Sequence, residues 1–219
     1  MNEGPLSRYR IQFQKGDLLR YIGHLDLHRT IERTLRRSKL PVDYSKGFNP
    51  RVKLNLSSAL PLGCTSIAEL ADIWLLSDLK TSDVLEALRL AAPPGLSFHT
   101  VEQIDLKTPS LQSQINAVEY RAQIQAMGDT TSLVEAVRLI LDSEELLRDR
   151  RGKRYDLRPL IQQLELCMDQ SAPTRLRMIL QVGEGTTGRP EEVLSALGID
   201  PAEAHIERTQ VFLEPTPSS

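Results

Sequence analysis

Two histidines and a glutamate in the stretch HLDLHRTIERTLRR are spaced four residues apart, at His24, His28 and Glu32. On a helix this spacing places the three side chains on one face, and such groups bind metals or move protons. Three ligands in line along one helix suit a tetrahedral metal ion poorly, and His99 and His205 fall in separate predicted strands. We therefore predict no metal site. His24 remains a candidate catalytic acid or base, or a phosphate contact at the helix start, and a buried or capping histidine is the alternative.

The same predicted helix, residues 24–39, carries a stripe of arginines. They lie roughly opposite an apolar stripe that repeats every four residues, at Leu27, Ile31 and Leu35. Guanidinium groups at one-turn spacing suit phosphates, which they bind with paired hydrogen bonds. The alternative is an ordinary solvated helix face, in which Asp26 pairs with a neighbouring arginine. The candidate nucleic-acid contacts of this helix are Arg29, Arg33, Arg36 and Arg37, and Arg20 precedes them.

Charge is unevenly distributed along the chain. Residues 8–53 contain twelve lysines and arginines against four acids, a net charge of +8, whereas the whole chain of 219 residues has −2. The rest of the chain therefore carries −10. This polarity favours an anionic partner, and nucleic acid in particular.

The stretch YSKGFNPRVK, residues 44–53, is predicted to be a loop with a turn at Asn49-Pro50. Its aromatic residues alternate with cations, a pattern that suits single-stranded nucleic acid through stacking and phosphate neutralisation. The alternative is that Phe48 anchors the loop to the core. The candidate contacts here are Tyr44, Lys46, Phe48, Asn49, Arg51 and Lys53.

A second basic stretch, RDRRGKRYDLRP at residues 148–159, is predicted to be a hairpin tip or a loop. It either reaches toward phosphates or is a solvated turn. Its candidate contacts are Arg151, Lys153, Arg154 and Arg158.

These residues are carried by a pattern of elements that occurs twice. Alternating or apolar runs predict strands, and periodic runs between them predict helices. The first set spans residues 1–107, a polar linker is expected at 107–116, and the second set spans 117–219 with an extra hairpin. Each reads β-α-β-β-α-β, so we predict an α+β protein made of two tandem ferredoxin-like (βαββαβ) sandwiches with antiparallel sheets.

Several function classes are disfavoured by what the sequence lacks. It contains no Walker loop, GxSxG or HExxH motif, and no three-cysteine motif for an iron–sulfur cluster. We expect no membrane span and no signal peptide. Two distant cysteines, Cys64 and Cys167, indicate a reducing compartment, and we expect a cytoplasmic protein with no cofactor of its own.

A set of motifs in the first half of the chain resembles the bacterial radical-SAM-linked family, a domain of unknown function found beside or fused behind a radical-SAM protein. The motifs are RY at 20–21, HLD at 24–26, RR at 36–37, LP at 40–41, YSKGFNP at 44–50 and LPLG at 60–63, with YDLRP at 155–159. The resemblance covers most of the chain and weakens after about residue 115.

The resemblance implies an accessory RNA-binding protein without catalysis of its own. It would present tRNA or rRNA to a radical-SAM enzyme acting in trans, and that partner would carry the iron–sulfur cluster and S-adenosylmethionine. A looser similarity, to CRISPR repeat-processing endonucleases, implies a metal-independent ribonuclease in which His24 works with Tyr44 or Lys46. The third hypothesis is a protein-only adaptor for the radical-SAM partner.

Overall fold

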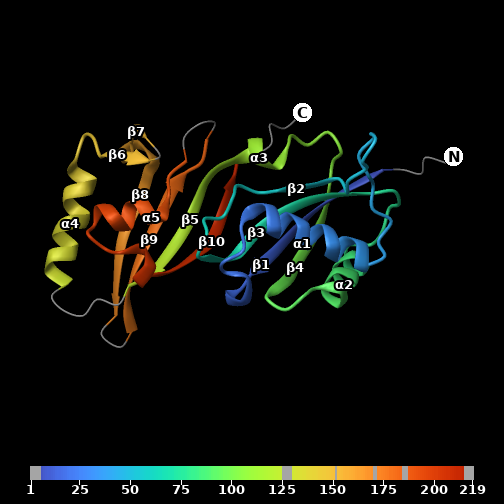
Figure 1. The fold of residues 1–219 in the computed structure, drawn as a ribbon, viewed down its shortest axis with the longest axis horizontal. Coiled ribbons are helices and arrows are strands. Elements are labelled where there is room, and N and C mark those ends of the chain that lie inside the picture. Colours follow the sequence, from blue (N-terminus) through green and yellow to red (C-terminus); the bar gives the residue numbers. More distant parts are fainter. Residues whose placement is uncertain (1–5, 125–129, 151, 170–171, 184–186, 215–219) are drawn as a thin grey trace. The chain divides into compact units, whose positions relative to one another are not determined.

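The computed structural model describes residues 6–124, 130–150, 152–169, 172–183 and 187–214 (Figure 1). The protein is a mixed α+β protein with mainly antiparallel strands and few helices. It divides into two compact units, one running to Ile115 and joined by Glu214, the other comprising Asn116–Leu213. No helix in the described ranges has the length and apolarity needed to cross a membrane.

The first unit contains the predicted order of elements, β-α-β-β-α-β. Its sheet has the strand order β4-β1-β3, with β2 paired to β3, and every pair is antiparallel. Figure 1 shows α1 and α2 on the same face of these strands. The elements are β1 (Ser7–Lys15), α1 (His24–Arg37), β2 (Leu54–Leu56), β3 (Cys64–Leu75), α2 (Thr81–Ala91), β4 (Leu96–Ile104) and the short helix α3 (Leu111–Gln114).

Helix α1 forms where its apolar period predicts it. Leu27, Ile31 and Leu35 are at most 2% exposed, and they belong to one core cluster with strand residues such as Ile11 and Ile73. Burying three such side chains is worth several kcal/mol in total, at about 2 kcal/mol each. The helix ends at Arg37, two residues before Lys39 adopts a left-handed conformation with φ 59°.

The opposite face of this sheet holds a buried cluster of charges. Asp72 is fully buried and receives Nη2 of Arg8 at 2.6 Å and Nε of Arg10 at 2.8 Å. Both arginines belong to the +8 charge of residues 8–53, but they contribute little to a basic surface, because they are only 2% and 7% exposed and share one carboxylate. The exposed positive charge of residues 8–53 is correspondingly smaller than the sequence implies.

The segment 107–116, predicted as a polar linker, contains the short helix α3 and makes hydrogen bonds to strand β1. The carbonyl oxygens of Thr108 and Pro109 accept hydrogen bonds from Arg8. Gln114 accepts one from Arg10 at 3.2 Å, and Leu111 is fully buried. Residues 107–115 therefore contact the charged cluster and belong to the first unit.

The second unit repeats the order of elements with an extra hairpin, as predicted. Its sheet has the order β10-β5-β9-β8, and β6 pairs with β7 as a separate two-stranded sheet. The elements are β5 (Ile115–Gln123), α4 (Thr130–Asp142), β6 (Leu147–Arg150), β7 (Lys153–Asp156), β8 (Ile161–Asp169), β9 (Ala172–Gln181), α5 (Pro190–Ala196) and β10 (His205–Leu213).

Candidate nucleic-acid interface

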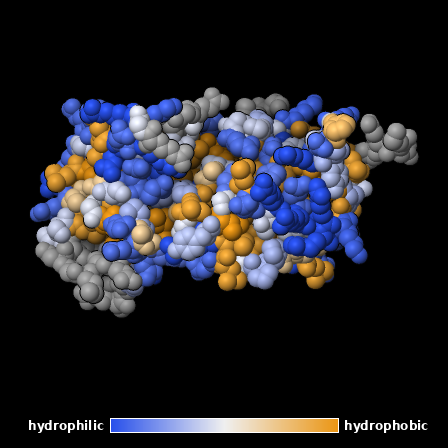
Figure 2. Space-filling model, in the orientation of Figure 1, coloured by the Kyte–Doolittle hydropathy of each residue, from blue (hydrophilic) through white to orange (hydrophobic). Residues whose placement is uncertain are grey.

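The outward face of α1 carries the four predicted arginines, all of them exposed. Figure 2 shows hydrophilic side chains gathered over this helix. Arg29 lies 3.1 Å from Asp26 and Arg36 lies 2.6 Å from Glu32, in ion pairs along the helix surface. Arg33 is exposed and forms no ion pair with any described residue.

Arg37 differs from the other three because it helps to hold the two helices of the unit together. Its Nη2 donates to the carbonyl oxygen of Ala91 at 3.0 Å, at the end of α2. It also approaches the Thr34 hydroxyl at 3.3 Å. A variant at Arg37 would therefore disturb packing as well as surface charge.

The loop 43–53 has a closed neck and an open tip. At the neck, Tyr44 bridges Val52, and the amide of Ser45 donates to the carbonyl of Arg51 at 2.7 Å. Asp43 forms an ion pair with Lys53. At the tip Phe48 is 101% exposed, so the interpretation that it anchors the loop to the core is wrong. The loop also exposes Lys46, Asn49 and Arg51.

His24 and the loop lie at opposite ends of the first unit's sheet. Antiparallel pairing places Ser7 beside Leu75 at one end and Lys15 beside Ser66 at the other. Val42, just before the loop, bridges Leu75, whereas α1 begins with His24 shortly after the Lys15 end. The sheet between them is nine residues long in β1, or about 30 Å. The structure therefore does not bring His24 together with Tyr44 or Lys46, as the ribonuclease hypothesis requires.

The spacing of His24, His28 and Glu32 does not assemble a metal site. Glu32 is engaged by Arg36, and the part of the chain that the structure describes holds no group of three His, Cys, Asp or Glu side chains suited to a metal ion. His24 is partly buried at the first position of α1.

Arg20 connects two loops at the end of the sheet near His24. Its Nε donates to the carbonyl oxygen of Gly63 at 2.5 Å, and its guanidinium lies 5.4 Å from the ring centre of Tyr21. Lys15, the last residue of β1, is buried, and its ammonium donates to the carbonyls of Arg20 and Cys64 at 3.0 Å each. The LPLG turn is thereby fixed to β1, and Arg20 has a structural role that the sequence did not indicate.

The basic hairpin of the second unit is present, and it is confined to the β6–β7 pair. Lys153 and Arg154 are exposed on β7, and Arg151 lies outside the described residues. Arg158 is not a free surface cation, because its guanidinium donates to the carbonyls of Leu141 at 2.8 Å and Ile161 at 3.2 Å. It fixes the end of α4, and its proposed phosphate contact is therefore replaced by a structural role.

Tyr155, beside these cations, has a buried hydroxyl without a hydrogen-bond partner among the described residues. Burial, together with the negative charge of Glu192, raises the pKa of this phenol above its ordinary value, against the opposing charges of nearby arginines. An unpaired buried hydroxyl costs free energy. We therefore expect Tyr155→Phe to leave the free energy of unfolding unchanged or to raise it by about 1 kcal/mol in urea titrations. A loss of stability on the same scale would mean that the hydroxyl has a partner in solution.

The polar face of the second unit's sheet is internally neutralised. Arg177 lies 2.7 Å from Glu119 and 3.0 Å from Glu165, so its charge is shared by two carboxylates. Burial alone would raise the pKa of Glu119, but hydrogen bonds from Thr209 and Arg177, with the positive charge of Arg177 and Arg121, lower it below its ordinary value. This face is therefore a poorer anion-binding surface than α1.

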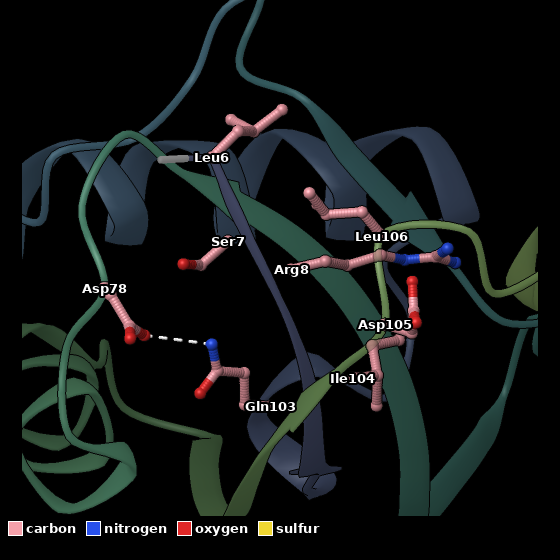
Figure 3. Close-up of a pocket in the computed structure, with 8 residues that line it drawn as sticks. All are labelled: Leu6, Ser7, Arg8, Asp78, Gln103, Ile104, Asp105 and Leu106. Atoms are coloured by element: carbon pink, nitrogen blue, oxygen red, sulfur yellow. Dashed lines mark hydrogen bonds between the residues drawn. The ribbon is translucent and has the colours of Figure 1, made fainter. Parts of the chain in front are cut away.

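A shallow pocket of about 340 Å³ lies beside the first residues of β1 (Figure 3). The close-up shows Asp78 hydrogen-bonded to Gln103, at 2.9 Å, on one side of it. Asp78 is also within 3.2 Å of the hydroxyl of Tyr9. These mutual contacts tie the polar groups to one another and to the core.

Fold and site together define an α+β protein with an exposed basic helix and a projecting aromatic loop in its first unit. The chain belongs to the family described as "Uncharacterized protein conserved in bacteria (DUF2344)", whose model matches residues 8–190. No curated protein matches the chain.

Two solved structures show a low-level similarity. One is described as "Crystal Structure of a Cbf5-Nop10-Gar1 Complex", with a TM-score of 0.48 and 11% identity over 95% of this chain and 50% of the other. The second is "Crystal structure of the archaeal box H/ACA sRNP Nop10-Cbf5 complex", with a TM-score of 0.42 and 12% identity over 95% of this chain and 49% of the other. The chain thus spans about half the length of each. At these identities and scores the similarities say nothing of what the chain does.

Proposed function

We propose that this protein binds RNA through the outward face of α1 and serves as an accessory to a radical-SAM enzyme that acts in trans. The observation that carries the RNA-binding proposal is the exposed arginine series on α1, with Arg33 unpaired among the described residues between Arg29 and Arg36. Guanidinium groups bind phosphates with two parallel hydrogen bonds, which gives them an advantage over lysines at such a site.

The surface ion pairs of α1 do not compete strongly with a phosphate. Both partners of the Arg29–Asp26 pair are more than 60% exposed, and the Arg36 side chain is 53% exposed. Pairs of this kind contribute about 0.2–1 kcal/mol, because water screens them. An RNA phosphate can therefore replace the exposed Asp26 carboxylate at little cost.

The wider proposal concerns the fold of the two units and the link to a radical-SAM enzyme. We infer that both units are ferredoxin-like sandwiches, which the orders β4-β1-β3-β2 and β10-β5-β9-β8 support. The link to a radical-SAM enzyme rests on the sequence resemblance. It implies a tRNA or rRNA substrate and a partner that holds the iron–sulfur cluster and S-adenosylmethionine, with the cytoplasm as the place of action.

Binding of the full chain to total tRNA and to rRNA fragments, measured by fluorescence anisotropy without added metal, tests the proposal. We expect affinity to fall steeply as salt rises, since phosphate contacts release counterions. The RNA should remain intact on a denaturing gel. Salt-independent binding, or none at low salt, would contradict the RNA-binding role, and cleaved RNA would contradict the absence of catalysis.

A further inference from the structure

The tip of the loop 43–53 holds an aromatic ring away from the body of the first unit. Phe48 is 101% exposed, more than any other large apolar side chain among the described residues. The neck below it is closed by the Tyr44–Val52 bridge and by two hydrogen bonds between Ser45 and Arg51, at 2.7 and 3.0 Å. Covering this ring with a ligand would remove its apolar surface from water, which is favourable.

Cations without ion-pair partners among the described residues flank this ring. Lys46 precedes Phe48 by two residues and Arg51 follows it by three, and both are exposed. The only acid of the loop, Asp43, is engaged at the neck by Lys53. The tip therefore consists of an aromatic face between two positive charges, which complements a base between two phosphates.

We propose that Phe48 stacks on an unpaired base, so that the ligand of this protein is RNA with a single-stranded segment. The inference rests on the proposed function and specifies its substrate class. Bases inside a duplex are already stacked, and the major groove of an RNA helix is too deep and narrow for a side chain to read. A projecting ring is therefore useful only where a base is free to leave the stack, in a loop, a bulge or an end.

Asn49 extends the contact from the face of the base to its edge. It is exposed and directly follows Phe48 in the chain. Its amide offers both donors and an acceptor, the groups that pair with the hydrogen-bonding edge of a nucleobase. The arginines of α1 bind the neighbouring phosphates, and the loop tip selects for an unpaired nucleotide.

A short single-stranded RNA with one 2-aminopurine, and a duplex of the same sequence, test this assignment with the full chain. We expect tighter binding of the single strand, with quenched 2-aminopurine fluorescence. Phe48→Ala should weaken single-strand binding about tenfold, abolish the quenching and leave duplex binding unchanged. Phe48→Trp should restore both the affinity and the quenching. Leu90→Ala, which removes another exposed apolar side chain (83% exposed, on α2), is the matched control and should have no effect.

The outcomes separate this inference from the function on which it depends. Wild-type affinity and quenching in Phe48→Ala would overturn the stacking role while RNA binding stands. Failure of the wild-type chain to bind either probe at low salt would overturn the proposed function itself. Loss of capture of the radical-SAM partner by Phe48→Ala, with RNA affinity intact, would mean that the tip docks on protein and would also overturn the inference.

Discussion

Replacing Asp72 by Ala is expected to lower the free energy of unfolding by about 3–5 kcal/mol, the usual cost of leaving buried charges without their partner. The Asp72 carboxylate receives hydrogen bonds from Arg8 and Arg10, whose side chains are 3% and 8% exposed. Without it, two guanidinium groups are buried beside each other, and their remaining acceptors among the described residues are carbonyl and amide oxygens. Urea titration followed by circular dichroism measures the loss.

Two further variants separate charge from volume and position. Asp72→Asn keeps the shape of the side chain and removes its charge, so an intermediate loss is expected. Asp26→Ala breaks the exposed pair with Arg29 and should cost roughly 0.5 kcal/mol or less. If Asp72→Ala cost no more than Asp26→Ala, the cluster would not be the electrostatic centre of the first unit.

The second large effect is expected in RNA binding, from the double variant Arg33→Glu/Arg36→Glu. A pair of unit charges 4 Å apart in water interacts by about 1 kcal/mol, and reversal turns each attraction into a repulsion of similar size. Allowing for screening by salt, we expect affinity to fall about a hundredfold at low ionic strength. The slope of log affinity against log salt should become shallower by about two, one for each lost phosphate contact.

Arg37 is left unchanged in this variant because its bond to the carbonyl of Ala91 would make a loss of affinity ambiguous. The charge-matched control is Lys80→Glu/Lys107→Glu, which reverses two exposed lysines of the same unit outside α1. It should retain most of the affinity. Equal losses in the two double variants would mean that RNA responds to net charge alone, and α1 would not be the interface.

Local patterns predicted the parts of the fold that depend on neighbours in sequence. The period of Leu27, Ile31 and Leu35 is sufficient for α1, because an amphipathic helix shows its buried face within a few turns. The charged hairpin in the second unit was also predictable, since a polar turn between two extended runs is a local signal.

The buried charges were not predictable in the same way, because their partners are distant in the chain. Arg10 meets Asp72 at a separation of 62 residues and Gln114 at 104. One signal was present: Asp72 stands among apolar residues in ELADIWLL, where an acid needs a buried partner. Sequence also left the position of Phe48 open, because an aromatic residue in a Gly/Pro turn occurs both as an anchor and as an exposed tip.

Distances along the chain also set the order in which the first unit can be completed during synthesis. Arg8 donates to the carbonyl of Thr108, which lies 100 residues later in the chain. The amide of Glu214 donates to the carbonyl of Gln114, a bond that forms only after the whole second unit has been made. At about 5–20 residues per second, Arg8 waits roughly 5–20 seconds on the ribosome for that acceptor. A nascent chain halted before residue 108 would contain Asp72, the carboxylate that pairs with Arg8 and Arg10, but not the carbonyl and amide groups that complete their hydrogen bonds.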